Sequence, residues 1–493
     1  MRRSIGILGA WLASAAISFG ADATVLADAA EQGDRDRVMA LVADGGDVNQ
    51  AQADGTTALH WATYRDDAPL AHLLLEAGAN PVVENRYGMT PLYLACFNGN
   101  AALIGELLQR GADPNAKRKD SETALMTAAR TGNLAAVRVL VEAGADLEMT
   151  LPGGQTALIW ATAEGNFAVV DYLIEAGADF EHTVPSGFAP IFFAVREGHA
   201  EVVQLLLDRG VDPNVVIEPT GQRGYKPPQE GTSPLILAIE NGHFDLAVQL
   251  LEAGADPNDQ RSGFAPLHTL SWVRKPDMGD NSAGDPVPIG QGRSTSMEMA
   301  MALVEYGADV NVPIASGNGR GKNGAHLPNL GNTPFMLACH TGDVELAKFL
   351  LSEGADPMVG NYDGTTPFLA AAGVGRHAPE EEAGNEDDAL ELLALLLELG
   401  ADVNQRDYND ETAMHGAAYA NFPKVAAFLV ENGADIEIWN RPNDRGWSPL
   451  DIADGYRPGN FKPSAATSEA VTGLMLAQGV TPDTAGRVLQ NQY

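Results

Sequence analysis

The sequence predicts an all-α repeat solenoid, in which short helical pairs stack side by side as one curved array. A Gly-Ala-Asp-like triplet recurs every 33 residues from Gly45 to Gly210, and it returns at longer intervals as far as Gly433. A Thr-Pro-Leu-His-like segment keeps the same register. Hydrophobic residues make up 45% of the chain but aromatic residues only 6%. The apolar residues are therefore mostly Ala, Leu and Val, which allow short helices to approach closely.

Each marker has a structural role. In segments such as Thr90-Pro91, the hydroxyl caps free N–H groups and proline occupies the first helical position. A Gly-Asn or Gly-His pair then interrupts the chain, and a second helix with a Leu/Val face follows. A glycine such as Gly144 ends this helix in the left-handed conformation, and Asp-Pro-Asn or Asp-Val-Asn turns the chain outward. Each period therefore predicts two helices and an extended connection.

This pattern closely resembles the ankyrin repeat family, whose framework runs from Gly-x-Thr-Pro-Leu-His to Leu-Leu-x-x-Gly-Ala-Asp. The resemblance covers residues 24–479 and implies helix-turn-helix units with β-hairpin or loop connections, in a curved single stack of about twelve units. We expect the following organisation: an N-terminal capping unit at 24–50, regular repeats at 51–215, repeats with insertions at 216–444, a degenerate C-terminal capping unit at 445–479 and a tail at 480–493.

Insertions interrupt the later repeats at two kinds of position. Residues 216–229 and 312–329 lie where the family has its hairpin, and residues 273–295 and 374–387 lie between the two helices of a repeat. One interpretation is that they are tolerated surface loops, because closing a long loop costs little additional entropy. The other is that they build an extra binding rim on this half of the chain.

Residues 1–23 are typical of a signal peptide. Arg2 and Arg3 precede an apolar run from Ile5 to Phe19, and small residues follow, so cleavage near Gly20 or Ala23 fits. The run is shorter than the ~20 residues that span a bilayer, although an N-terminal membrane anchor is the alternative. We expect export to a periplasm or to the extracellular space, by either the general or the twin-arginine route, with no membrane association after cleavage.

The charge of the chain restricts its partners. Acidic residues outnumber basic residues 66 to 31, which gives a formal charge of −35. Such a charge argues against nonspecific nucleic-acid binding and against docking on anionic lipid. It predicts a protein partner with basic patches, steered electrostatically, and we expect the chain itself to be a monomer. Cys96 and Cys339 are six repeats apart, so we expect two buried free thiols without a bridge.

The sequence predicts no catalytic, metal-binding or cofactor-binding residues. Residues 319–324 match Gly-x-Gly-x-x-Gly, but neither a strand nor a helix flanks them as a nucleotide site requires. His60, His268 and His415 occupy the framework position of the repeat, where histidine is structural in the family. His326, His340 and His377 lie near insertions without a metal-ligand spacing.

The run of acidic residues between Glu380 and Asp388 is the densest charge cluster of the sequence. Its simplest interpretation is a solvated loop that places carboxylates at the start of the following helix, where the helix dipole favours them. The alternatives are calcium or a basic partner, but the spacing does not fit the calcium loop of a helix-loop-helix hand.

The resemblance implies that binding uses the concave face of the first helices and the hairpin tips. Aromatic residues and arginine dominate the energetics of protein interfaces, and they recur at two registers of the first helix and at the tips. The candidate protein-binding residues are Trp61, Tyr64, Leu94, Phe97, Trp160, Phe193 and Arg196 on the helices, and Tyr87, Phe188, Phe264 and Tyr362 at the tips. The alternative is that these side chains pack across repeats and complete the core.

The most direct function is a noncatalytic protein-binding scaffold, whose rigid surface meets a partner at little ordering cost. One alternative is a secreted effector that acts on a host or neighbouring cell. Another is an enzyme whose site is assembled from the later insertions, although no nucleophile–base pair or metal-ligand set supports it.

Overall fold

The structure of the protein, a computed structural model, describes residues 25–220, 229–276, 288, 290, 292–315, 330–376, 382–456 and 463–482. The predicted signal peptide, His326, His377, most of the insertions at 216–229, 273–295 and 312–329, and residues 377–381 of the insertion at 374–387 lie outside these residues. The described residues form twelve successive helix pairs and one additional short helix. We number the pairs as repeats 1 to 12. The described residues contain no helix long and apolar enough to cross a membrane.

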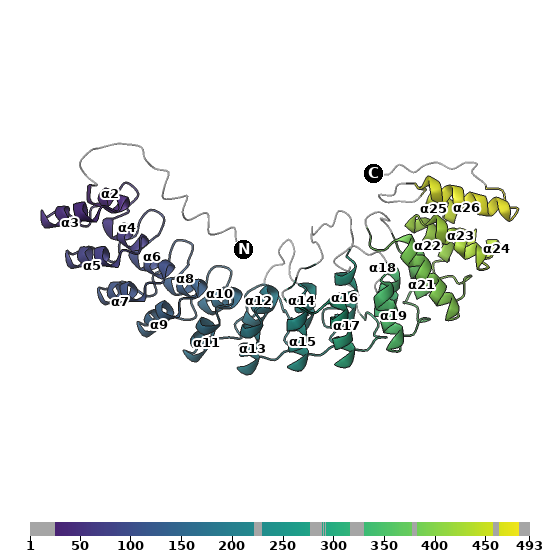
Figure 1. The fold of residues 1–493 in the computed structure, drawn as a ribbon, viewed down its shortest axis with the longest axis horizontal. Coiled ribbons are helices and arrows are strands. Elements are labelled where there is room, and N and C mark those ends of the chain that lie inside the picture. Colours follow the sequence, from purple (N-terminus) through teal and green to yellow (C-terminus); the bar gives the residue numbers. More distant parts are fainter. Residues whose placement is uncertain are drawn as a thin grey trace. The chain divides into compact units, whose positions relative to one another are not determined.

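The chain divides into two compact parts, of which the first ends at Val184. In this N-terminal part, the helices lie in two rows of first and second helices (Figure 1). Repeats 1 to 5 comprise α2 (Val25–Gln32) and α3 (Arg35–Ala43), α4 (Ala58–Tyr64) and α5 (Ala68–Glu76), α6 (Pro91–Asn98) and α7 (Ala101–Gln109), α8 (Ala124–Thr131) and α9 (Leu134–Glu142), and α10 (Ala157–Ala163) and α11 (Phe167–Glu175).

The C-terminal part begins at Pro185 and has the same two-row arrangement. Repeats 6 to 9 comprise α12 (Pro190–Glu197) and α13 (Ala200–Asp208), α14 (Pro234–Glu240) and α15 (Phe244–Glu252), α16 (Pro266–Arg274) and α17 (Ser296–Glu305), and α18 (Pro334–Thr341) and α19 (Val344–Ser352). Repeats 10 to 12 comprise α20 (Pro367–Ala372) and α21 (Glu386–Glu398), α22 (Ala413–Ala420) and α23 (Pro423–Glu431), α24 (Ile436–Trp439), and α25 (Pro449–Ala453) and α26 (Ala465–Ala477).

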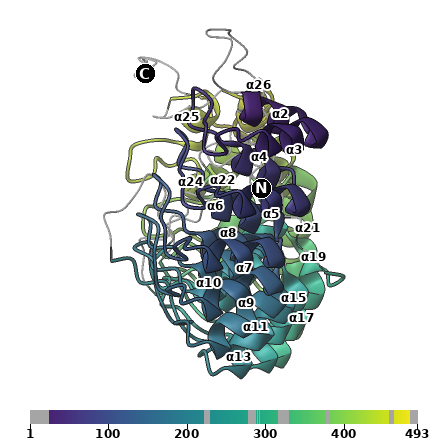
Figure 2. The ribbon, with the colours of Figure 1, turned by 90° about the vertical axis from the view of Figure 1, so that its left-hand side faces the viewer.

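The connections between repeats are loops with tight turns, the second of the two forms that we expected. Among the described residues, strand-like pairing is limited to isolated bridges such as Ala51 with Thr57 and Arg406 with Thr412. In each part these connections lie to one side of the helices (Figure 2). They are too short and too tightly turned for a ladder of bonds, so the fold is all-α.

Capping residues fix where each helix begins and ends. The Thr90 side chain accepts a hydrogen bond from the backbone of Tyr93, and Pro91 follows it at the first helical position. The same helix ends at Gly99, whose φ of 74° is left-handed. Gly144, expected to end the second helix of repeat 4, also has a positive φ of 90°. The capping roles predicted from the repeat pattern are confirmed.

The framework histidines join neighbouring repeats. His268 accepts a hydrogen bond at Nδ1 from the Ala265 backbone at 3.0 Å, and its Nε2 lies 3.1 Å from the Asn332 carbonyl of the next repeat. Because Nδ1 accepts, the proton resides on Nε2 and is donated to that carbonyl. His60 makes the equivalent pair of contacts with Thr57 and Met89. The structural role predicted for this position is confirmed.

Asparagine side chains provide a second link between repeats, which we call the asparagine bonds. Asn115 donates from Nδ2 to the Gly144 carbonyl at 3.1 Å and accepts at Oδ1 from the Asp146 backbone at 2.7 Å. Asn258 bonds in the same way to Gly307 and Asp309, at 2.8 and 2.7 Å. The same pair of bonds starts from four further residues: Asn49, Asn214, Asn311 and Asn404.

A buried ion pair and exposed backbone hydrogen bonds hold the two ends of the insertion in repeat 8. Arg274 lies 2.6 Å from Asp343 in an ion pair whose side chains are 9% and 1% exposed. At the other end of the insertion, the backbone N–H groups of Arg293 and Ser294 bond to the Asp245 carboxylate, at 2.9 and 3.0 Å. Hydrogen bonds from Ser294 and Arg293 lower the pKa of that carboxyl group. The insertion therefore leaves and rejoins the stack at fixed points.

The two cysteines are as predicted. Cys96 and Cys339 are free and buried, and burial raises the pKa of both thiols above the ordinary value. A buried thiol with a raised pKa carries little thiolate and reacts slowly, so both residues pack as small apolar side chains.

Replacing one asparagine tests the asparagine bonds. Asn258→Ala removes both bonds and leaves the Gly307 carbonyl and the Asp309 N–H without this partner. We expect the free energy of unfolding to fall by about 1–2 kcal/mol, measured by urea denaturation. Met358 occupies the same register in repeat 9 without such bonds, so Met358→Ala is the matched control. Equal losses for the two variants would show that the asparagine bonds add nothing.

Histidine burial predicts acid sensitivity. Burial lowers the pKa of His268 to about 4, from an ordinary value of 6.5. The folded protein then binds fewer protons than the unfolded chain, so stability is full above pH 6.5 and declines as the pH falls towards 4. His268 alone contributes a loss on the order of 3 kcal/mol across this window.

The matched variant is His268→Met, because Met336 fills the same framework position in repeat 9 and is buried. We expect this variant to be less stable than the wild type at pH 7.5, through the lost hydrogen bonds, but to show a shallower decline between pH 6.5 and 4. Chemical denaturation at several pH values measures both effects. Equal declines of stability with falling pH in the wild type and in His268→Met would contradict the lowered pKa of His268.

Candidate functional site

Aromatic and arginine side chains gather on the first helices of the N-terminal part and on the connections beside them. Helices α4, α6, α8 and α10 are successive neighbours in one row (Figure 1). The partly exposed members of this group form what we call the aromatic–arginine surface: Tyr64, Tyr87, Phe97, Arg118, Arg130 and Trp160.

The first section of this surface is held by apolar packing. Tyr64 and Tyr87 pack against a buried cluster formed by Met89, Tyr93 and Leu94. The Trp61 ring meets the Tyr64 ring edge-on, with centroids 5.9 Å apart. These contacts fix the tyrosine rings in place, so a partner would meet side chains that are already ordered.

A polar network centred on Glu122 orders the middle section. The Tyr93 hydroxyl donates to Glu122 at 2.9 Å, and Arg118 donates to the same hydroxyl at 2.8 Å and to Glu122 at 3.0 Å. The Arg118 guanidinium also lies 4.7 Å from the centre of the Tyr93 ring. Burial, and then the Glu122 charge, raise the pKa of the Tyr93 hydroxyl, which therefore stays protonated. Glu122 thus neutralises Arg118 and orients it.

Arg130 and Trp160 form the last section. The Arg130 guanidinium lies 5.8 Å from the centre of the Trp160 ring and 3.5 Å from the Glu122 carboxylate. Both side chains remain partly exposed. A cation stacked on an aromatic face offers a partner a flat contact area together with a directional donor.

The C-terminal part repeats this combination on α12. Arg196 lies over the rings of Phe188 and Phe193, 5.7 and 5.3 Å from their centres. The two rings pack edge-on, with centroids 5.4 Å apart. Phe193 and Arg196 are partly exposed, whereas Phe188 is buried. Two of the three residues that the sequence suggested for this cluster, Phe193 and Arg196, are therefore accessible to a partner.

The structure corrects the expectation of exposure for four candidates. Trp61, Leu94, Phe188 and Phe264 are only 5, 6, 7 and 3% exposed. Trp61 donates from Nε1 to Gln52 at 2.9 Å, and Phe264 belongs to a core cluster and packs edge-on against Trp272. Leu94 and Phe264 pack against residues of neighbouring repeats, as the alternative interpretation has it. Tyr362 is 62% exposed, as expected for a tip residue.

Sequence reasoning missed three side chains that the same registers contain. Trp272 and Tyr419 lie four residues after His268 and His415, the position that Tyr64 holds after His60. Tyr408 occupies the same tip position as Tyr362 and is 81% exposed. Extending the registers past repeat 7 would have found all three.

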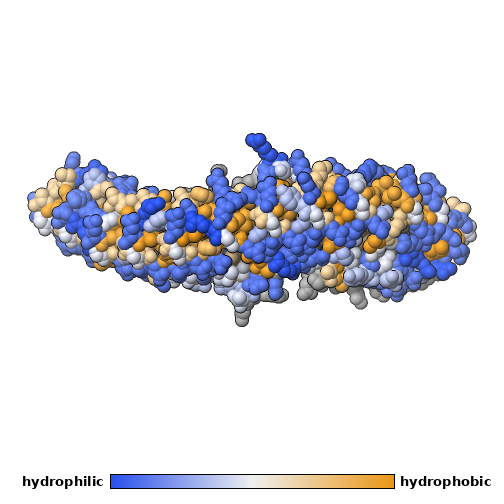
Figure 3. Space-filling model, turned by 90° about the horizontal axis from the view of Figure 1, so that it is seen from below, coloured by the Kyte–Doolittle hydropathy of each residue, from blue (hydrophilic) through white to orange (hydrophobic). Residues whose placement is uncertain are grey.

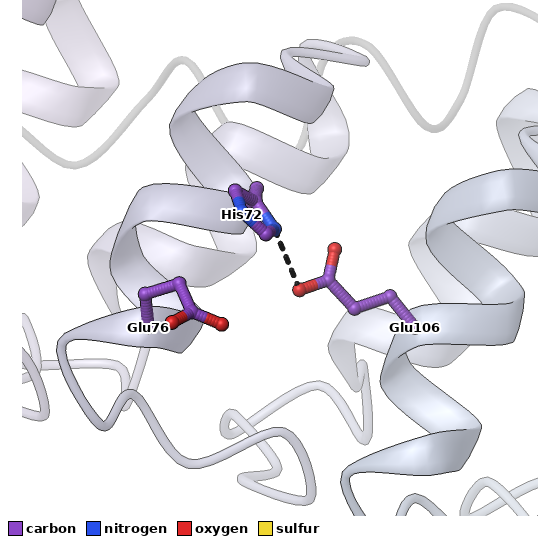
Figure 4. A group of neighbouring side chains, drawn as sticks. All are labelled: His72, Glu76 and Glu106. Carbon is purple, nitrogen blue, oxygen red and sulfur yellow. Dashed lines mark hydrogen bonds and ion pairs between the residues drawn. The ribbon is translucent and has the colours of Figure 1, made fainter.

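A group of potential metal ligands lies on the second helices of repeats 2 and 3. The ligand atoms of His72, Glu76 and Glu106 all lie within 4.8 Å of one another, and His72 Nδ1 is 2.9 Å from Glu106 (Figure 4). Arg110 forms ion pairs with both glutamates. Since this cation already pairs with both carboxylates, the cluster resembles a surface ion-pair network. His72 and Glu76, four residues apart on one helix, are the signal that sequence reasoning overlooked.

The acidic run begins the helix predicted for it. Glu386, Asp387 and Asp388 lie in the first turn of α21, which Asn385 caps. Lys424 lies 2.8 Å from Asp387, and Glu386 accepts from the Val425 backbone at 3.2 Å. These carboxylates therefore cap α21 and join it to α23, while Glu380 and Glu381 lie outside the described residues.

The side that carries the second helices has a more even mixture of residue types. Seen from the side on which the second helices lie, hydrophilic residues are interspersed with apolar residues (Figure 3). Exposed large apolar side chains such as Met39, Phe167, Met301 and Leu399 belong to different repeats. Single exposed apolar residues are ordinary on protein surfaces, so the first helices remain the stronger candidate.

Models of one repeat family match most of the chain. A model of three ankyrin repeats matches residues 26–118, 102–184, 125–217 and 182–261. A model of one ankyrin repeat matches residues 330–362, and a model of many copies matches residues 386–430.

Individual relatives match shorter segments. Alpha-latroinsectotoxin-Lt1a of Latrodectus tredecimguttatus is 32% identical over 123 residues, which are 25% of this chain and 8% of the toxin. The B-cell lymphoma 3 protein homolog of Mus musculus is 31% identical over 26% of this chain and 25% of its own length. The crystal structure of the human ASB11 ankyrin repeat domain, 28% identical, covers 47% of this chain and 98% of that domain with a TM-score of 0.40. The chain thus spans a quarter or less of these curated relatives.

Proposed function

The chain belongs to the ankyrin repeat family, and from that premise we propose that it is a noncatalytic protein–protein interaction scaffold. Ankyrin repeats are generally interaction modules. The partner is a protein, and it binds the aromatic–arginine surface of the N-terminal part. The observation that carries this proposal is the adjacency of ordered, partly exposed aromatic rings and arginines on four neighbouring first helices.

The chemistry of the surface supports protein rather than nucleic acid as the ligand. Arg118 and Arg130 both face Glu122, which lies 3.0 and 3.5 Å from them. Asp120 also lies 3.0 Å from Arg118, so two carboxylates balance the two guanidinium groups, and the arginines supply flat donors without a net positive charge. The chain as a whole carries −35. A partner with basic patches would be attracted over long range and would then exchange water for aromatic contacts at the surface.

The proposal extends to location and assembly. We propose that residues 1–23 direct export and are removed, so that the mature chain acts as a monomer in a periplasm or outside the cell. The arginine pair, apolar run and small residues of the N-terminal sequence support this. An effector acting on another cell is the second candidate, and the place where the mature chain accumulates separates the two.

Paired substitutions test the binding surface. Phe97→Ala with Arg130→Ala removes one aromatic and one cationic side chain from adjacent first helices, both partly exposed. We expect this double variant to lose the proteins that cross-link to the wild type in its native compartment, because such residues dominate interface energetics. Quantitative mass spectrometry of the cross-linked material provides the measurement.

The control variant removes the same kinds of side chain, one aromatic and one arginine, from the second helices. Phe167 on α11 and Arg138 on α9 are both exposed, so Arg138→Ala with Phe167→Ala removes equivalent side chains from the other row. We expect it to retain the cross-linked partners. Retention by both double variants, with unchanged circular dichroism spectra, would contradict the proposed surface.

Export is tested on the mature N-terminus. We expect N-terminal peptide mass spectrometry of the native protein to find a chain beginning at Ala21 or Thr24, recovered from the periplasmic or extracellular fraction. A chain that retains Arg2 and Arg3 and sediments with the membranes would support an N-terminal anchor instead. A mature chain recovered from a second cell type would favour the effector role.

A further inference from the structure

We propose that the connections of repeats 10 to 12 form a second binding strip, which takes an extended protein segment bearing arginine or lysine side chains. This inference rests on the proposed function in that the partner is a protein, but it uses residues of the C-terminal part that the aromatic–arginine surface does not include. The strip consists of Tyr362, Asp363, Tyr408, Asn409 and Asp444.

Two tyrosines on this strip are the most exposed large hydrophobic side chains of the described residues. Tyr408 is 81% exposed and Tyr362 is 62% exposed. They occupy the same tip position in adjacent repeats, where the N-terminal part has Arg86 and Lys119. Burying aromatic rings of this size stabilises an interface strongly, and here two of them lie on adjacent repeats.

Backbone hydrogen bonds set the order of residues along the strip. The Tyr362 N–H donates to the Leu330 carbonyl at 3.2 Å, and the Tyr408 N–H donates to the Asp363 carbonyl at 2.8 Å. The Asp444 N–H then donates to the Asn409 carbonyl at 3.0 Å. Each tip is therefore tied to the preceding one. Along the strip the order is Tyr362, Asp363, Tyr408, Asn409 and Asp444, so each tyrosine is followed by a polar residue.

The Tyr408 ring packs against Gly364 of the preceding tip. Gly364 has a φ of 76°, and a Cβ atom added to it would lie 3.0–3.2 Å from Cδ1, Cε1 and Cγ of Tyr408. One edge of the ring thus lies beside Gly364, while 81% of the residue stays exposed. Tyr362 is placed similarly, since a Cβ on Gly331 would lie 2.9 Å from its Cδ1. Because these glycines lack side chains, each ring can approach the backbone of the preceding tip.

Buried side chains make the tips rigid. Asn361 accepts at Oδ1 from the backbone of Asp363 and of Thr365, at 3.0 and 2.9 Å. Asp407 accepts in the same way from Asn409 and Glu411, both at 2.9 Å. The Thr365 hydroxyl donates to Asp407 at 3.1 Å and so links the two turns. A preordered strip loses little conformational entropy when a ligand binds.

The carboxylates decide which ligand fits. Asp363 and Asp444 have no ion-pair partner in the part of the chain that the structure describes, whereas Asp410 is 2.8 Å from Arg406. An arginine or lysine side chain can place its cation over an open tyrosine face while it bonds to the neighbouring carboxylate. Sugars also stack on aromatic rings, but a neutral sugar gains nothing from a chain of charge −35.

The test uses the mature full-length chain and an acetylated, amidated hexa-arginine peptide at 150 mM salt, measured by isothermal titration calorimetry. We expect Tyr362→Leu with Tyr408→Leu to weaken binding about tenfold, because two cation–π contacts are lost. Tyr362→Phe with Tyr408→Phe keeps both ring faces and should bind within about twofold of the wild type. Asp363→Asn with Asp444→Asn should also weaken binding.

The control is Tyr306→Leu, at an exposed tyrosine that follows α17 and is 42% exposed. We expect its affinity to equal that of the wild type. Equal affinity of the wild type and the double leucine variant, or no measurable binding by the wild type, would overturn the proposal. Tyrosine-dependent binding of cellohexaose without binding of the peptide would replace it with a sugar site.

The proposals for the two surfaces can be rejected independently of each other. The peptide measurement does not involve Phe97 or Arg130, so a lost peptide response with an intact cross-linking result would reject the strip alone. The converse result would reject the aromatic–arginine surface and leave the strip standing. A folded, full-length chain with unchanged thermal midpoint is required of every variant in the comparison.

Discussion

The register between neighbouring repeats is the constraint on which the rest of the structure depends, and asparagine bonds fix it at six of the junctions. A helical pair buries its faces only against neighbouring pairs, so the register between neighbours decides whether the stack continues. One asparagine side chain bonds to a carbonyl and an N–H of the next repeat, and thereby fixes that register. In repeats 3 and 4 the bonded residues are 29 and 31 positions apart, whereas Asn258 reaches 49 and 51 positions. The geometry is the same although an insertion intervenes.

This constraint explains why long insertions are compatible with the fold. A longer loop adds little closure entropy, provided that its ends stay where the stack requires them. The Arg274–Asp343 ion pair and the backbone bonds to Asp245 hold both ends of one insertion. Function is then free to use what the regular framework leaves exposed: aromatic and arginine side chains on the first helices, and tyrosines at the tips.

Much of the fold followed from the sequence because the repeat pattern is local. Thr90, Pro91 and Gly99 specify one helix through their own backbone geometry, and the framework histidines lie where the pattern places them. The degree of burial of Trp61 and Phe264 could not be predicted, since it depends on how closely the neighbouring repeat packs. The tip tyrosine Tyr408 was visible in the register, but its exposure depends on Gly364 in another repeat.

The central claim is that asparagine bonds carry the stack past three of its insertions, at residues 216–229, 273–295 and 312–329. Amide hydrogen exchange measures it directly, because the backbone N–H groups of Asp256, Asp309 and Asp356 donate to asparagine side chains beyond insertions, as Asp146 does in a regular repeat. The account predicts protection factors for the first three amides within about tenfold of that for Asp146. Rapid exchange at Asp256, Asp309 and Asp356 alone would contradict it and show that the insertions interrupt the stack.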